Sequence, residues 1–200
     1  KDEPENSTAY FNQYFGVDFF EDRPYYGGHY GNSNDNSYIL FSGSGIDFVM
    51  LFLEFDKEPN FEVMEWAKKV LRDHPDHFGI VVVHSLLFSN GSWTPQGWFV
   101  YKEFRNLPNV MLMTSGHIPG ESRRQDEFRE NTIHTMLSDF QEEEMGGEGK
   151  LRIWEFLPED DVLNVTTYSP TLDKFQTTED SQFSLELDID HPFMEIFTKD

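Results

Sequence analysis

Three short apolar runs constrain the fold of this chain more than any other feature of its sequence. They are FVMLFL at residues 48–53, IVVV at 80–83 and VMLM at 110–113. None of them alternates with polar residues, a pattern that is typical of strands buried on both faces of a sheet. Each run is also far shorter than the roughly 18 apolar residues that a membrane-spanning helix needs. We therefore expect three central strands and no membrane span.

Helical patterns separate the three runs. Residues 60–75 open with Asn60 as an N-cap, carry apolar side chains at helical spacing and stop at Pro75. Residues 94–108 carry aromatic side chains at the same spacing and stop at Pro108. The order strand, helix, strand, helix, strand implies parallel pairing with helical crossovers. The sequence therefore predicts an α/β core.

The two ends of the chain have a different character. The first 45 residues are rich in Gly, Asn, Tyr and Phe, and we expect a long loop that leads into SYILFS. From residue 131 onward, β-rich runs alternate with turn clusters such as GGEG and PEDD, which predicts antiparallel strands that complete or face the sheet. No linker or repeat marks a boundary. We therefore treat residues 1–200 as parts of one domain.

Composition excludes several classes of protein. Lys and Arg number 15 and Asp and Glu number 37, so the formal net charge is 15 − 37 = −22. This charge repels nucleic acid and anionic membrane surfaces, so we expect no nucleic-acid partner. There is no cysteine, so a metal site must use His, Asp, Glu, Asn or backbone oxygen. The polar opening KDEPENSTAY suggests a processed or truncated start, and we slightly favour an extracytoplasmic or secreted location.

Two histidines follow the second and third apolar runs. His84 comes directly after IVVV, and His117 comes four residues after VMLM. Ligands bind at the carboxyl ends of parallel strands in open α/β sheets, where both imidazoles can emerge at one edge. Neutral imidazoles at such an edge suit a divalent metal ion. The alternative is that each histidine is a buried, hydrogen-bonded core residue.

Other residues are weaker candidates for substrate contact. Arg123 and Arg124 follow His117 on a glycine-bearing turn, where a guanidinium could clamp phosphate, or could pair with neighbouring carboxylates at the surface. Glu121 is either a metal ligand or an exposed turn residue. His29 could line a cleft, or belong to an ordinary aromatic loop. His134 has apolar neighbours and is interpreted as a core histidine.

The segments around the two histidines resemble a known family. IVVVHS, followed about thirty residues later by VMLMTSGHIPGESRR, resembles the second half of the calcineurin-like metallophosphoesterases. In that family one strand ends in a lone metal-binding His and a later strand ends in a Gly-His-x-His motif. The flanking segments FDKEPNFEVMEWAKKVL, IHTMLSDFQ, GGEGKLRIWEF and VTTYSPTLDKF resemble a bacterial branch of the family. The resemblance therefore covers nearly all of the chain.

The resemblance implies a fold and an activity. The fold would be a metallophosphoesterase-like α-β-β-α sandwich of layered mixed sheets flanked by helices. The activity would be hydrolysis of a small phosphate ester, monoester or diester, by two divalent metal ions of Mn, Fe or Zn. His84 matches the lone ligand of the second metal, and His117 matches the first His of the Gly-His-x-His motif.

The sequence also departs from the family pattern. Pro119 stands where the second His of the motif would be, which puts the first metal site in doubt. The Asp-x-His, Gly-Asp and Gly-Asn-His motifs of the family's first half do not occur. We therefore expect residues 1–200 to be the C-terminal part of the domain, incomplete at the N-terminus and inactive alone. Two alternatives stay open: a non-catalytic α/β binding module, and another hydrolase class that uses the Tyr- and Asn-rich N-terminal loop.

Overall fold

A seven-stranded mixed sheet forms the centre of the molecule. The computed structural model describes residues 8–56 and 60–189, so residues 1–7, which carry most of the opening segment, lie outside the described part. The strand order is β1-β2-β3-β4-β5-β7-β6. The three apolar runs lie in β3 (Ile46–Leu53), β4 (Phe78–Val83) and β5 (Val110–Ser115), which pair in parallel. The prediction of a parallel α/β core is confirmed.

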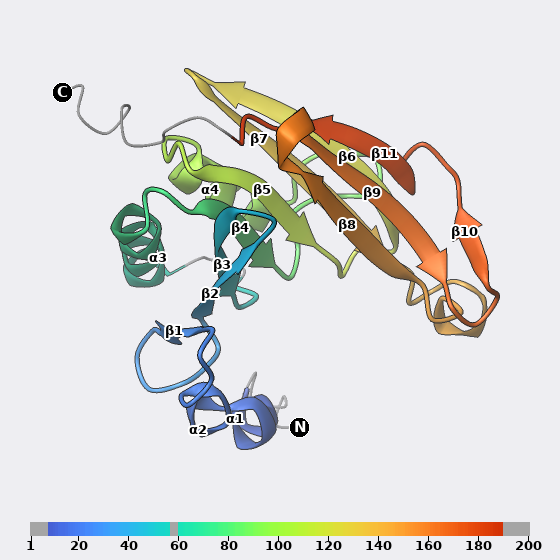
Figure 1. Cartoon of the computed structure of the whole chain (residues 1–200). Helices are drawn as coiled ribbons and strands as arrows, with labels where there is room; N and C mark the ends of the chain where they lie inside the picture. Colours follow the sequence, from blue (N-terminus) through green and yellow to red (C-terminus); the bar gives the residue numbers. More distant parts are fainter. Residues whose placement is uncertain (1–7, 57–59, 190–200) are drawn as a thin grey trace.

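Two helices cover one face of this sheet (Figure 1). Helix α3 spans Phe61–Asp73 and α4 spans Pro95–Phe104. The Asn60 side chain caps α3 by accepting a hydrogen bond of 2.8 Å from the amide of Glu62, as the sequence predicts. Alternate strand residues such as Val49, Leu51, Val81 and Val83 pack with the buried sides of the helices in one core cluster.

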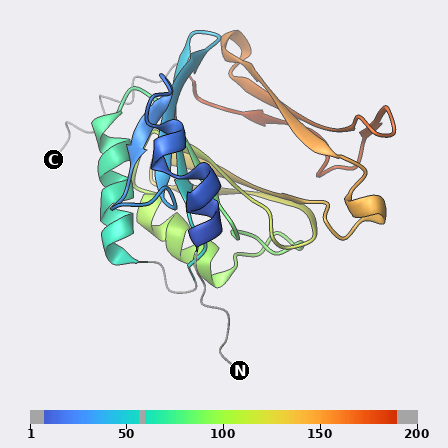
Figure 2. The same cartoon turned by 90° about the horizontal axis from the view of Figure 1, so that it is seen from below.

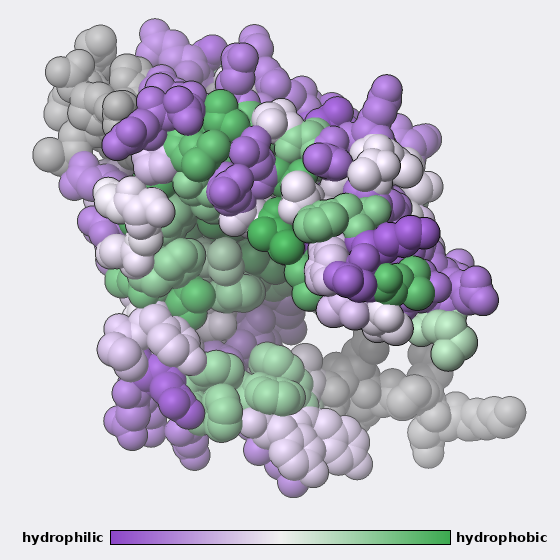
Figure 3. Space-filling view, turned by 45° about the vertical axis from the view of Figure 1, so that its right-hand side comes forward, coloured by the Kyte–Doolittle hydropathy of each residue, from purple (hydrophilic) through white to green (hydrophobic). Residues whose placement is uncertain are grey.

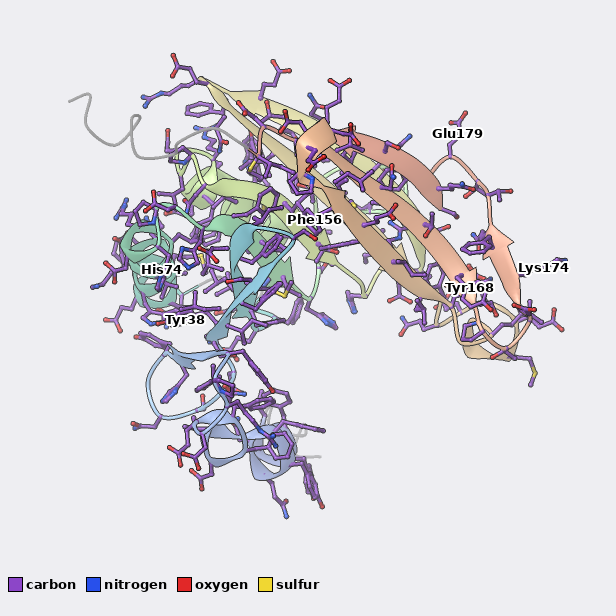
Figure 4. All side chains as sticks on the ribbon, viewed as in Figure 1. Tyr38, His74, Phe156, Tyr168, Lys174 and Glu179 are labelled. Atoms are coloured by element: carbon purple, nitrogen blue, oxygen red, sulfur yellow. The ribbon has the colours of Figure 1, made fainter. Side chains whose placement is uncertain are left out.

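A second, antiparallel sheet faces the other side, and Figure 2 shows the resulting layers. It contains β8 (Leu151–Leu157), β9 (Val162–Ser169), β10 (Lys174–Gln176) and β11 (Gln182–Glu186), with β9 at its centre. Phe156, labelled in Figure 4, places its ring 5.0 Å from that of Phe48 and 5.6 Å from that of Phe78. The fold is therefore a layered α/β architecture of two facing sheets, with helices on the outer face of the larger one.

The C-terminal third contributes to both sheets. The hairpin of β6 (Gly120–Phe128) and β7 (Asn131–Asp139) joins the first sheet. Strand β7 is antiparallel to β6 but parallel to β5, so the expectation of purely antiparallel strands from residue 131 was wrong for this strand. The single-turn 3-10 helices Glu144–Gly146 and Pro158–Asp160 flank β8.

The N-terminal segment is more ordered than the predicted long loop. It contains α1 (Ala9–Phe15), α2 (Val17–Phe20), β1 (Tyr26–His29) and β2 (Ser37–Gly43). The two short helices bury none of their residues, and the aromatic side chains that α1 carries at helical spacing, such as Tyr10 and Tyr14, are exposed. Contacts between successive aromatic rings and asparagine hydrogen bonds hold them instead, including one of 2.9 Å from Asn34 Nδ2 to the carbonyl of Phe15. Among the described residues, no helix is long and apolar enough to cross a membrane.

Candidate functional site

The two histidines at the strand ends lie side by side. His84 follows the last residue of β4, and His117 lies two residues after the end of β5. Because β4 and β5 are parallel neighbours, both imidazoles reach the same edge of the sheet, and their ring centroids are 4.4 Å apart. Phe55, which follows β3, lies 5.3 Å from the His84 ring and 5.8 Å from the His117 ring. The structure therefore brings together the pair that strand order led us to expect.

His117 occupies a strained backbone conformation. Its φ is +67°, in a region that residues other than glycine rarely adopt. The amide of Ile118 donates a 2.8 Å hydrogen bond to the carbonyl of Gly116, so His117 is the central residue of a γ-turn with positive φ. Such strain persists only where the surrounding structure enforces it, and it is frequent at functional sites.

The electrostatic surroundings favour the neutral form of the His84 imidazole. Burial lowers the pKa of His84, the nearby His117 lowers it further, and Asp139 opposes the shift. A neutral imidazole is the form that binds a metal ion. Asp139 lies at the carboxyl end of β7, the parallel neighbour of β5, so a third strand delivers a charged group to this edge. The pairing of β7 with β5 was not predicted, and Asp139 was therefore missed.

A cavity of about 610 Å³ opens beside His84. Its lining is mainly apolar, with Phe11, Phe52 and Val82 among the contributors. Ser115 also lines it, and its buried hydroxyl has no hydrogen-bond partner within the described residues. Figure 3 views the molecule from this side, where hydrophobic residues gather between the second sheet and the end formed by α1 and α2. The cavity can hold a small molecule or another segment of polypeptide.

The donor set fits only part of a metal ion's coordination shell. Two imidazoles suit Mn, Fe or Zn, and the sequence holds no cysteine that could add a thiolate. Within residues 8–56 and 60–189, no three His, Asp or Glu side chains gather closely enough to hold a metal ion. His84 and His117 can therefore supply two ligands, and any further ligands must come from elsewhere.

The two arginines lie in strand β6, so their predicted position in a turn was wrong. Arg124 forms a bidentate pair with Asp126 at 2.5 and 2.6 Å, and its Nη1 donates to the carbonyl of Gly91 at 2.9 Å. Its guanidinium also stacks 4.6 Å from the Trp93 ring centroid. These contacts fix the planar guanidinium of Arg124 against the residues around it, so the group has a structural role.

Arg123 points to the opposite face of β6. Its guanidinium lies 4.2 Å from the Phe183 ring centroid, and its Nε is 3.5 Å from a carboxylate oxygen of Asp180. Neither Arg123 nor Arg124 lines the cavity beside His84. Pairing with a neighbouring carboxylate, which was the alternative to phosphate binding, therefore describes Arg124, whereas the partner of Arg123 is Asp180, a carboxylate distant in the sequence.

Glu121 is a buried side chain, and the expectation of an exposed turn glutamate was wrong. Its carboxylate is 8% exposed and forms an ion pair with Arg152, which is 7% exposed. It also accepts hydrogen bonds from Thr167 at 3.3 Å and Gln176 at 2.8 Å. A carboxylate engaged in this way is unsuited to act as a metal ligand, which was the other interpretation of Glu121.

Three further histidines, His29, His74 and His134, have other surroundings. His29, in β1, has its Nδ1 3.1 Å from the hydroxyl of Tyr26 and does not line the cavity. His134, in β7, is buried, and its Nε2 lies 3.1 Å from the carbonyl of Glu186, which agrees with its interpretation as a core histidine. His74, labelled in Figure 4, ends α3 with its ring 5.8 Å from that of Tyr38. It precedes β4 and so belongs to the opposite edge of the sheet from His84.

The chain is similar in sequence to one part of a longer protein. No protein-family model matches the chain. The chain is 35% identical over 199 residues to "Uncharacterized protein YvnB" of Bacillus subtilis (strain 168). The alignment covers 92% of this chain and 15% of YvnB, so the chain spans about 15% of the length of the relative it matches.

Proposed function

We propose that the complete protein hydrolyses phosphate esters with divalent metal ions, and that this chain supplies two ligands from the second half of a metallophosphoesterase-like α-β-β-α domain. The observation that carries the proposal is the His84–His117 pair, whose ring centroids are 4.4 Å apart at the carboxyl edge of parallel strands. The sequence resemblance assigns a metal-binding role to the same two residues.

The role of each residue follows from its position. When bound, metal ions activate water and stabilise the charge that develops on the phosphoryl oxygens. His84 is held by the end of β4, and partial desolvation lowers the pKa of its imidazole, which favours the neutral form that donates a lone pair. His117 is held by the γ-turn, and the Phe55 ring lies close to both imidazoles. In this proposal the remaining ligands lie outside residues 1–200.

A non-catalytic binding module is the second candidate function. The observation that favours it is the engagement of both arginines by carboxylates, Arg123 with Asp180 and Arg124 with Asp126, which leaves neither guanidinium committed to a phosphate. The mainly apolar cavity beside His84 is also compatible with a binding role.

The test compares this chain with one extended upstream by about a hundred residues, a length taken from usual domain size. We would measure bound divalent metal and manganese-stimulated hydrolysis of p-nitrophenyl phosphate and bis(p-nitrophenyl) phosphate. The extended chain should bind metal and turn over, residues 1–200 alone should not turn over, and His117→Ala should abolish both properties of the extended chain.

A matched variant controls for general effects of losing a histidine. His29→Ala removes an imidazole that contacts Tyr26 and lies outside the cavity lining, so metal content and turnover should be retained. If the extended chain holds no metal and hydrolyses neither ester, the phosphoesterase proposal is wrong and the binding module takes its place.

A further inference from the structure

We infer that Glu121 is a positioning residue, whose buried contacts with the second sheet hold the γ-turn that presents His117 to His84. The inference rests on the proposed function where it concerns metal affinity. The arrangement of the two rings can be measured without any metal, so the two ideas can fail separately.

Glu121 connects the turn to every strand of the second sheet but β11. It lies in β6, four residues after His117 and directly after Gly120. Its carboxylate accepts hydrogen bonds from four side chains of the second sheet and its connections: Arg152 of β8, Thr167 of β9, Gln176 of β10 and Ser181. A carboxylate that satisfies four donors from separate segments has little freedom to move.

The partner of Glu121 makes this contact costly for stability. The Arg152 side chain is 7% exposed, and burial lowers its pKa although Glu121 favours its charge. Its Nη2 donates to Glu121 and to the carbonyl of Asp180, whereas Nε and Nη1 have no partner within the described residues. Apolar side chains would join the two sheets with a smaller desolvation penalty. What a buried ion pair adds is a defined alignment of one sheet on the other. The strained turn at His117 lies next to this ion pair and requires such a fixed alignment to persist.

The other face of β6 is tied to the loop that follows His84. The hydroxyl of Ser122 donates to the carbonyl of Phe88 at 2.9 Å, and Arg124 donates to the carbonyl of Gly91 at 2.9 Å. Strand β6 is therefore fixed to the second sheet through Glu121 and to the His84 loop through its next residues. Loosening the Glu121 contact should release the His117 end of the pair first.

The first test uses the metal-free full chain. Nuclear Overhauser contacts between the ring protons of His84 and His117 report the pair, and the Glu121→Gln variant should lose them. Lys68→Met is the control because Lys68, whose side chain is 12% exposed, forms an ion pair at 2.7 Å with Glu103, which is 26% exposed, between α3 and α4 and away from β6. The control should keep the ring contacts. Retention of the contacts in Glu121→Gln would overturn the inference.

The second test separates positioning from general stability. The double variant Glu121→Met, Arg152→Met replaces the ion pair by apolar side chains and should keep the sheets packed. Zn²⁺ affinity that depends on His117 should nevertheless fall about tenfold or more, as it does when partners of metal ligands are removed. Affinity that recovers together with stability would overturn the inference. The affinity is measured in the chain extended upstream by about a hundred residues. If that extended chain binds no Zn²⁺, the proposed function fails and the ring contacts alone decide.

Discussion

The strained turn at His117 makes a prediction about backbone energetics. Replacing His117 by Gly or by Ala removes the same imidazole, so the difference between the two variants isolates the cost of the positive φ. A residue with a Cβ pays about 1–2 kcal/mol in the left-handed region, which glycine does not pay. Glycine loses about 0.5–1 kcal/mol more conformational entropy on folding. The Gly variant should therefore be more stable than the Ala variant by about 0.5–1 kcal/mol.

Urea denaturation at fixed pH measures this difference. The midpoint should shift without a change in m, because the two variants expose the same surface on unfolding. In thermal unfolding a difference of this size corresponds to about 1–4 °C for a domain of this length.

The control is the same pair of substitutions at Glu127, an exposed residue of β6 with an ordinary negative φ. There Ala should be more stable than Gly by about 0.5–1 kcal/mol, so the sign should reverse between the two positions. An Ala variant at His117 that equals or exceeds the Gly variant would show that the γ-turn does not persist in solution, and the argument for an enforced site would fail with it.

Three further predictions concern the surrounding structure. Burial lowers the pKa of His134, so below about pH 6.5 the unfolded chain binds a proton that the folded chain does not, and stability should fall as pH decreases. His134→Met should therefore make urea midpoints less dependent on pH between 7 and 5. An unchanged dependence of the midpoint on pH would contradict the lowered pKa. Arg124→Lys should cost about 1 kcal/mol of unfolding free energy because lysine cannot replace the bidentate fork or its stacking on Trp93, and a neutral result would mean that the fork is not formed. Gly97→Ala should destabilise α4 by about 1–3 kcal/mol, against the usual helix preference for Ala, because the new Cβ would lie 2.0 Å from the carbonyl oxygen of Leu86.

The sequence predicted the part of the fold that depends on local patterns. Residues 48–53, 80–83 and 110–113 became central strands because a run without polar residues can be satisfied only where both faces are covered. Helix α3 began at its predicted cap, Asn60, because an N-cap is a property of a few adjacent residues. The His84–His117 pair followed from the strand order alone, since parallel neighbours end at one edge.

What the sequence did not predict depends on partners distant in the chain. Strand β6 contains the residues ESRRQDEF, whose many charges are typical of a surface turn. In the structure Glu121 of this strand forms an ion pair with Arg152, thirty-one positions later. Nothing local distinguishes this glutamate from an exposed one. Helices α1 and α2 are only seven and four residues long and bury no residue, so they depend on ring contacts such as Phe11–Phe15, at 5.9 Å, and were predicted as a loop.

The two imidazoles of the pair are held by different means, and this difference decides which of them controls the site. His84 continues directly from β4, which is paired on both sides along the sheet, so its backbone position is fixed by strand pairing. His117 projects from a strained turn, whose conformation depends on Glu121 and the second sheet. A change in the packing of the two sheets would therefore move His117 relative to His84 and leave His84 in place. Metal affinity at this edge should accordingly respond to substitutions in the second sheet, although the ring beside the pair, Phe55, belongs to the segment after β3.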